Sequence, residues 1–202
     1  MYSHVKRVLD FTLSLLGCLV LWPLFLIIMA GIKIDSKGPI LFRQKRVGKD
    51  KEYFNILKFR TMDQDTPNDV PTHLMKQANC HITRFGGFLR RTSLDELPQL
   101  INILKGDMSI VGPRPALWNQ YDLIAERDKG NSNKIRPGLT GLAQINGRDE
   151  LDIDVKARYD NYYADHLTFI TDVKCFFGTF CKVISQNGVI EGEKISTEDK
   201  TK

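Results

Sequence analysis

The longest hydrophobic segment of the chain lies close to its N-terminus. Residues 11–32 form a run of 22 residues without a charged side chain. As an α-helix this run would be about 33 Å long, which is enough to cross a hydrocarbon core of about 30 Å. The pattern therefore predicts that the segment associates with a membrane.

Pro23 lies in the middle of this run. A proline inside a helix removes a backbone hydrogen bond and kinks or breaks the helix. The two halves, 11–22 and 24–32, would be only about 18 and 14 Å long. Lys6 and Arg7 precede the run and a basic segment follows it, so both flanks favour the cytoplasmic side. A re-entrant helix broken at Pro23 satisfies both flanks; a straight span and a cleaved signal peptide are the alternatives.

After the membrane segment, the pattern predicts a β-hairpin and several helices. Two strand-like segments, 40–47 and 52–61, flank Gly48-Lys49-Asp50, which is typical of a hairpin. Segment 62–83 is rich in Asp and Pro and predicts a surface loop. Apolar positions at helical spacing then predict a helix that starts near residue 94 and stops at Gly106.

Two further helices are expected over 117–127 and 153–165, followed by an amphipathic helix near the C-terminus. The apolar stripe of that last helix consists of Val173, Phe176, Phe177, Phe180 and Ile184. Such a stripe faces the core by default, or a membrane surface. The elements together predict an α+β fold in three parts: a membrane helix over 1–33, a mixed domain over 34–190 and a disordered polar tail over 191–202.

Composition excludes a largely disordered protein and localises the positive charge. Of the 202 residues, 42% are hydrophobic and 26% charged, as in globular proteins. The net charge is +5, whereas residues 33–60 alone carry +6, so the basicity is one patch. A patch of this kind attracts phosphate groups of nucleic acid, anionic lipid or a small substrate.

Asp95 and Glu96 are the first candidates for chemistry. Ser93-Leu94-Asp95-Glu96 matches a capping box, so from its spacing alone a helix cap is the favoured interpretation. Pro98 follows closely and predicts that both carboxylates lie near the positive end of the helix. We expect the helix dipole to keep Asp95 ionised, as a nucleophilic carboxylate must be. Two adjacent carboxylates also suit a Mg²⁺ ion that binds phosphate oxygens.

Several arginines and one glutamine extend the set of candidate phosphate ligands. Arg90 precedes the acidic pair, and turns with proline present Arg114 and Arg136. A lone Arg-Pro is usually a solvated loop residue, but several in one short chain favour anion binding. Gln144 and Arg148 add donors that suit phosphate, ribose or uracil.

Six motifs occur in an order typical of one family. They are Lys58-Phe-Arg-Thr-Met62, Arg90 followed by Ser93-Leu-Asp-Glu-Leu-Pro-Gln-Leu100, Leu104-Lys-Gly-Asp-Met-Ser109, Val111-Gly-Pro-Arg-Pro115, Arg136-Pro-Gly-Leu-Thr-Gly141 and Ala143-Gln-Ile-Asn-Gly-Arg148. On these motifs, over roughly residues 1–190, the chain resembles the bacterial sugar transferases, in particular their small monotopic phosphoglycosyl transferases. One departure is Trp22, since many relatives have serine before the membrane proline.

The resemblance implies a monotopic catalytic domain on the cytoplasmic face of the bacterial inner membrane, anchored by a re-entrant helix broken at Pro23. It implies a Mg²⁺-dependent reaction in two steps. The aspartate matching Asp95 attacks the sugar-bearing phosphate of a UDP-sugar, expelling UMP and leaving a covalent aspartyl-phosphosugar. Polyprenyl (undecaprenyl) phosphate then accepts the sugar-1-phosphate, in the first membrane step of capsule, O-antigen, exopolysaccharide or glycoprotein glycan assembly.

The resemblance also implies roles for individual residues. Glu96 completes an acidic dyad with Asp95 that serves metal binding and catalysis. The implied contacts to the diphosphate or nucleotide are Arg60, Arg90, Arg114 and Arg148, and the family also places acidic residues at Asp160 and Asp172. The expected partners are therefore the UDP-sugar donor, the polyprenyl phosphate acceptor and membrane lipid, without nucleic acid.

Two alternatives are weighed against this enzyme. The first is a basic membrane-bound adaptor without catalysis, which binds anionic lipid or partner proteins through residues 33–60. The second is an enzyme that transfers the sugar alone and therefore releases UDP instead of UMP. The identity of the released nucleotide separates the second alternative from the phosphosugar transfer.

Overall fold

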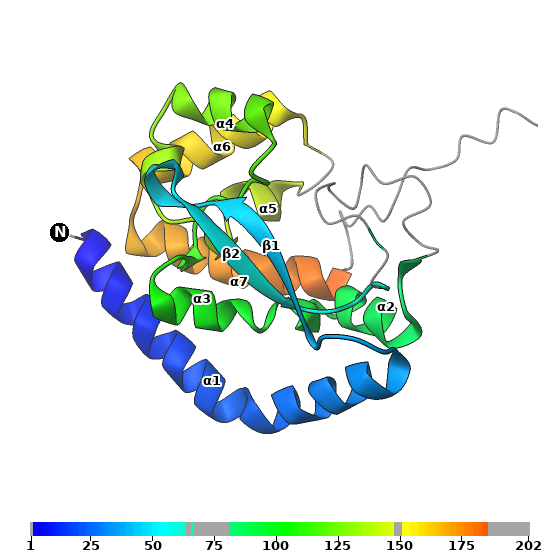
Figure 1. The fold of residues 1–202 in the computed structure, drawn as a ribbon. Helices are drawn as coiled ribbons and strands as arrows, with labels where there is room; N and C mark the ends of the chain where they lie inside the picture. The colour runs from blue at the N-terminus through cyan, green and yellow to red at the C-terminus, as the bar shows by residue number, and fades with distance from the viewer. Residues whose placement is uncertain (1, 64–65, 67–80, 148–150, 186–202) are drawn as a thin grey trace, which may run out of the picture.

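A computed structural model describes residues 2–63, 66, 81–147 and 151–185 (Figure 1). The predicted α+β class is confirmed. Its helices and strands are α1 (Tyr2–Asp35), β1 (Leu41–Val47), β2 (Tyr53–Phe59), α2 (Arg84–Arg91), α3 (Gln99–Lys105), β3 (Ser109–Val111), α4 (Tyr121–Asp128), β4 (Gly138–Thr140), α5 (Leu142–Asn146), α6 (Ile153–Asp165) and α7 (Phe169–Ser185). The short 3₁₀ helices η1 (Lys49–Lys51), η4 (Leu94–Glu96) and η5 (Ser132–Lys134) lie between them. The predicted tail at 191–202 and most of the predicted loop at 62–83 lie outside the described residues.

The predicted hairpin is confirmed and lies in the middle of the molecule. Strands β1 and β2 are antiparallel, with Leu41 opposite Phe59. Below the hairpin in Figure 1, Ile56 of β2 packs against Ile103 of α3. Near its turn, Val47 packs with residues of α4 and α6. A second, parallel pair is formed by β3 and β4. The hairpin therefore joins α3, below it in Figure 1, to α4 and α6 above it.

Helix α1 is continuous through Pro23 and bends instead of breaking (Figure 1). The predicted break is therefore corrected to a bend. Proline removes one backbone hydrogen bond and crowds the preceding turn, which kinks a helix without stopping the turns that follow. Within the described residues, α1 is the one helix long and apolar enough to cross a membrane, with a mean hydropathy of 2.6 over its most apolar window.

The bend brings both ends of α1 against the rest of the protein. At the C-terminal end, Ile28 and Ile32 are buried against Phe59 and Leu89. Gly31 allows this contact, because a Cβ atom there would lie 2.6 Å from Cε1 of Phe85. In the middle of the helix one face packs on the domain, where Ser14 is buried and Gly17 lies against Leu100 of α3. The other face exposes apolar residues, which include Leu13, Leu16, Leu19, Val20, Trp22 and Ile27. This shape, with two docked ends and an apolar bend, favours the re-entrant prediction over a straight span.

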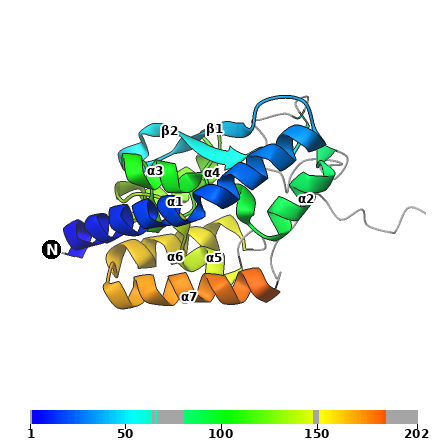
Figure 2. The same cartoon turned by 90° about the horizontal axis from the view of Figure 1, so that it is seen from below.

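The predicted helix boundaries are right for some segments and wrong for others. Helix α6 has the predicted bounds, whereas α4 begins four residues later than residue 117. On α7, Phe176 and Phe177 are exposed and Cys175 is buried, so the default core-facing interpretation of the stripe is wrong for these phenylalanines. Seen from below, α1 and α7 both run across the molecule, with α5 and α6 drawn between them (Figure 2). The exposed aromatic face of α7 suits a membrane surface.

Candidate active site

The acidic pair lies on η4, between α2 and α3, and does not form a capping box. Ser93 has a left-handed backbone conformation (φ 56°) and its side chain caps nothing in η4, whereas a capping serine needs an extended backbone. Helix α3 begins only at Gln99. The capping prediction is therefore wrong, and the dipole of α3 is not what keeps Asp95 ionised.

Three cations from separate parts of the chain surround this pair. Lys58 of β2 places Nζ 2.7 Å from Oε1 of Glu96 and 4.0 Å from Oδ2 of Asp95. Arg114 places one terminal nitrogen 3.2 Å from the same Glu96 oxygen. Arg90, at the end of α2, is close enough to lower the pKa of Asp95. The structure thus unites Asp95, Glu96, Arg90 and Arg114 as the sequence predicted.

Lys58 lies beside the acidic pair, although the sequence motifs did not predict it as a site residue. A signal was available, because Lys58 interrupts a strand in which Ile56, Leu57 and Phe59 are all apolar and all prove buried. A lysine inside such a strand needs a partner for its charge. Its partners are the carboxylates of η4.

The buried carboxyl of Asp95 has an unusual pKa. Only 7% of the residue is exposed, and burial raises the pKa from 3.8 to about 6. Lys58 opposes this rise most strongly, Glu96 adds to it, and Arg90 and Arg114 oppose it. At neutral pH Asp95 is therefore mostly an anion, poorly solvated and ringed by positive charge, which suits a nucleophile.

Asn102 of α3 fixes β2 beside the acidic pair. Its side-chain oxygen accepts the backbone N–H of Leu57 at 2.9 Å, and its side-chain nitrogen donates to the carbonyl of Asn55 at 2.9 Å. Asn102 is 1% exposed. Because Leu57 directly precedes Lys58, these bonds fix the position of the Lys58 backbone relative to α3.

Asp160 supports the site from a distance. Its carboxylate accepts from the guanidinium of Arg127 at 2.6 and 3.0 Å, and Arg127 also donates to the backbone carbonyl of Arg114 at 2.9 Å. Burial raises the pKa of Asp160 and the Arg127 guanidinium opposes this effect. Asp160 thus positions the loop that carries Arg114 and does not lie with the acidic pair Asp95 and Glu96.

The remaining predicted residues have partners in other places. Arg60 donates to the carbonyls of Ser36 and Lys37 and so caps the end of α1. Its contact with the diphosphate stays a prediction. Gln144 donates to the carbonyl of Leu139, and Arg136 donates to the carbonyl of Gly106. Arg148 lies outside the described residues.

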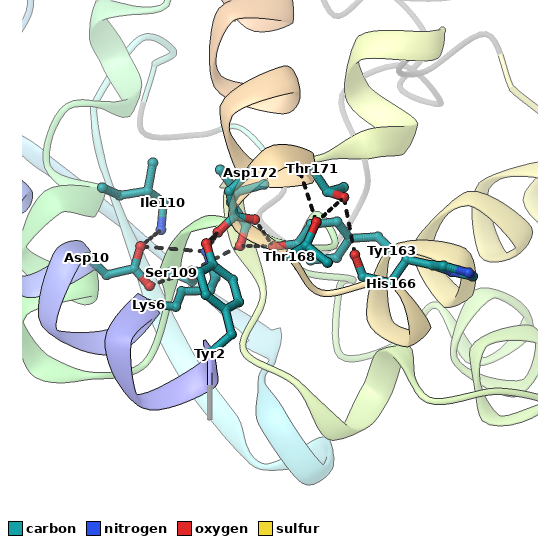
Figure 3. A network of polar contacts seen from close by, with 11 residues as sticks. Tyr2, Lys6, Asp10, Ser109, Ile110, Tyr163, His166, Thr168, Thr171 and Asp172 are labelled. Atoms are coloured by element: carbon teal, nitrogen blue, oxygen red, sulfur yellow. Dashed lines mark hydrogen bonds and ion pairs between the residues drawn. The ribbon is translucent and has the colours of Figure 1, made fainter.

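Asp172 belongs to a polar network at the start of α1 (Figure 3). It accepts from the hydroxyls of Tyr2 and Tyr163, each at 2.6 Å, and from Nζ of Lys6 at 2.7 Å. Asp10 lies 3.7 Å from the same ammonium and accepts from Ser109 at 2.6 Å. This network, rather than the acidic cluster of η4, is where Asp172 acts, and it docks α1 on the domain.

Replacing Lys6 by Met is expected to undock the start of α1. The change leaves the buried carboxylate of Asp10 and the half-buried carboxylate of Asp172 without their cation. Breaking a buried ion pair costs about 3–5 kcal/mol. In a chain of this size the melting temperature should fall by roughly 10 °C. Thermal unfolding in detergent measures this effect. Lys33→Met, at the exposed other end of α1, is the control; equal melting temperatures for the two variants would contradict the docking role.

A known protein family shares the sequence that builds this site. The family model for bacterial sugar transferases matches residues 1–186. The chain belongs to the bacterial sugar transferase family.

Relatives of this sugar transferase are of two sizes. It is 37% identical to the uncharacterized sugar transferase EpsL of Bacillus subtilis, over 96% of this chain and 94% of EpsL. It is 39% identical to the exopolysaccharide production protein PSS of Rhizobium leguminosarum bv. phaseoli, over 87% of this chain and 92% of that protein. The UDP-glucose:undecaprenyl-phosphate glucose-1-phosphate transferase of Escherichia coli is also 39% identical, but the chain, matched over 88% of its length, spans only 40% of that protein.

The donor set of the sugar transferase suits a magnesium ion only in part. The described residues contain no group of three or more His, Cys, Asp or Glu side chains that would form a complete metal site. Mg²⁺, however, is commonly bound by one or two carboxylates together with substrate phosphates and water. Asp95 and Glu96 therefore fit an ion that arrives with a diphosphate.

Proposed function

We propose that this sugar transferase moves a sugar-1-phosphate from a UDP-sugar to undecaprenyl phosphate and releases UMP. The observation that carries the proposal is the buried Asp95, with its raised pKa, among Lys58, Arg90 and Arg114. A carboxylate so placed serves as a nucleophile toward phosphorus while the cations hold the phosphate oxygens. The names of the relatives supply the classes of donor and acceptor.

The chemistry proceeds in two displacements at one phosphorus atom. A carboxylate oxygen of Asp95 attacks the sugar-bearing phosphate, the bond from phosphorus to the bridging oxygen breaks, and UMP leaves with the electron pair. An oxygen of undecaprenyl phosphate then attacks the same phosphorus, and the carboxylate of Asp95 is released. Lys58 and Arg114 offset the negative charge in both steps. When bound by Asp95 and Glu96, Mg²⁺ would neutralise phosphate charge as a Lewis acid.

The anchoring helix supports this function because it is packed directly on the active-site elements. Ile28 and Ile32 of α1 contact Phe59 and Leu89, which lie next to Lys58 on β2 and Arg90 on α2. Insertion of the α1 bend would therefore hold the acidic pair near the headgroups, where the phosphate of the acceptor lies. We assign the domain to the cytoplasmic face of the bacterial inner membrane, since the cations at both ends of α1 favour that side.

The cations of the hairpin segment argue against the adaptor alternative. A basic adaptor would present the hairpin charges to its partner, but three of them face inward. Lys58 bonds Glu96, Arg60 bonds Ser36, and Arg46 donates to the carbonyl of Pro115. Two relatives are named for exopolysaccharide production, which supports a role for the proposed reaction in the first membrane step of polysaccharide assembly.

Identification of the released nucleotide tests the proposal. The full chain, purified in detergent, is incubated with UDP-glucose, undecaprenyl phosphate and Mg²⁺, with other UDP-sugars in parallel. We expect UMP and a lipid-linked phosphosugar, both lost when EDTA removes the metal. Release of UDP would instead indicate transfer of the sugar alone, and no nucleotide release from any UDP-sugar would support the adaptor.

A further inference from the structure

A second cationic site lies at the start of α1, apart from the acidic pair. A cavity of about 160 Å³ opens there between α1, η1, β3 and η5. Five cations and one carboxylate line it: Lys6, Arg7, Lys49, Lys134, Arg136 and Asp10. None of the residues that surround Asp95 lines this cavity. The site is therefore distinct from the one assigned to phosphosugar transfer.

The cations of this cavity differ in how far the protein already satisfies them. Lys6 is held by Asp172, and Arg7 donates to the carbonyls of Ile103 and Leu104 at 2.6 and 3.0 Å. Arg136 uses only its Nε, which donates to Gly106 at 2.8 Å; within the described part of the chain its two terminal nitrogens have no partner. Lys49 lies 3.6 Å from a carboxylate oxygen of Asp50, and Lys134 donates to the side-chain oxygen of Asn131 at 2.9 Å. Both lysines are exposed, and each ammonium has three N–H donors. Three cations therefore retain donors for a ligand.

The chemistry and size of the cavity fit a single phosphate group. Guanidinium and ammonium groups that converge on one space bind phosphate oxygens through charge-assisted hydrogen bonds. The volume is close to the about 150 Å³ that admits a benzene molecule in a protein core. It thus accommodates a phosphate, whereas a nucleotide-sugar is too large.

The position of the cavity along α1 points to the bilayer as a source of this phosphate. Exposed apolar side chains already flank Arg7 on α1, among them Val5 and Val8, and Leu13 lies about 9 Å further along the helix axis. The headgroup layer on each side of a bilayer is roughly 5–8 Å thick. Phe169 and Ile170, at the start of α7 close to Asp172, are also exposed and apolar. With the bend of α1 inserted in a bilayer, the cavity would therefore lie at headgroup depth, beside surfaces suited to acyl chains.

We propose that this cavity binds a phosphate group, supplied either by an anionic phospholipid or by soluble phosphate. Bound lipid would hold the start of α1 at the membrane surface, in addition to the protein network around Asp172. This role is separate from catalysis, because it requires neither Asp95 nor the donor nucleotide.

Calorimetric titration of the full chain in detergent tests the proposal, with dihexanoyl phosphatidylglycerol and inorganic phosphate as separate probes. The double variant Lys49→Gln/Lys134→Gln removes two exposed cations from the cavity. Its matched control is Lys33→Gln/Lys37→Gln, which removes the same charge from the other end of α1. We expect binding to weaken at least tenfold in the cavity variant and less than twofold in the control. Arg136→Gln should weaken binding similarly.

The outcomes distinguish a lipid source of phosphate from a soluble one, and both from binding that depends only on net charge. Tight phosphatidylglycerol binding supports a lipid source, and the same pattern with inorganic phosphate alone supports a soluble one. Equal weakening in the cavity and control variants would overturn the proposal, because binding would then follow net charge. Competition by UDP-glucose would also overturn it, since the donor diphosphate would then occupy the cavity.

Discussion

Replacement of Asp95 by Asn is expected to abolish UMP release while making the protein more stable. The amide keeps the size of the carboxyl but cannot act as the nucleophile, so turnover should fall by about 10³-fold or more. A residue important only for the fold would lose activity and stability together. Lower activity together with higher stability would therefore identify Asp95 as a residue that lowers the stability of the fold but is required for the reaction.

The gain in stability follows from the raised pKa of Asp95. Folding lifts this pKa from 3.8 to about 6, so protonated Asp95 contributes stability that is fully present below about pH 3.8 and lost as the pH rises through about 6. Two pKa units correspond to roughly 3 kcal/mol. The amide of the Asp95→Asn variant cannot ionise, so at pH 8 the variant avoids up to this cost, and its melting temperature should be several degrees higher.

Two measurements check this prediction. Nucleotide release reports the activity, and thermal unfolding at pH 5 and pH 8 reports the stability, whose difference from wild type should be larger at pH 8. Asp154→Asn, at an exposed position on α6, controls for the amide itself and should change neither quantity. Turnover close to that of the wild type would contradict the nucleophile assignment.

Features that depend on local periodicity could be predicted from the sequence. The hairpin follows from two strand-like segments around Gly48, and α6 from apolar spacing over 153–165. The bend of α1 follows from Pro23, although a break was expected. These patterns arise from neighbours within one or two turns, which the sequence displays directly.

Features that depend on distant contacts could not be predicted in the same way. Ser93 looks like a helix cap, but the contacts of Glu96 with Lys58 and Arg114 hold the segment in a different turn. Lys6 and Asp172 are 166 positions apart and yet form one ion pair. The motif order predicted one set of arginines, but it did not show that Arg90 and Arg114 lie beside the acidic pair while Arg60 caps α1. The spacing of residues predicts helices and strands, whereas the ion pairs between distant side chains depend on how the whole chain packs.

The apolar stripe of α7 illustrates a related limit. A helical stripe has the same spacing whether it faces a core or a lipid surface. In the structure Cys175 takes the buried face and Phe177 is exposed. Helix α7 packs on α5 and β3, and the surface that these elements left available decided which of its residues are buried. The sequence of α7 does not contain that information.

Replacement of Lys58 by Met is expected to reduce turnover at pH 7 by about 10²-fold and to move the pH profile toward alkaline pH. Lys58 is the strongest influence that lowers the pKa of Asp95, so its loss raises that pKa further and leaves less of the nucleophile ionised. Glu96 also loses a partner 2.7 Å away, and the phosphate loses a nearby cation.

The pH profile of UMP release distinguishes this mechanism from simple damage to the fold. In Lys58→Met, part of the lost rate should return between pH 7 and pH 9 as Asp95 ionises, and Lys58→Arg should keep a profile close to that of the wild type because the charge remains. Lys45→Met, on the other strand of the hairpin, removes a lysine that lies 4.0 Å from the ring centroid of Tyr53 rather than beside the acidic pair, and it should leave the profile unchanged. If Lys58→Met lowers the rate equally at every pH, then Lys58 does not tune Asp95, and its role is confined to holding phosphate.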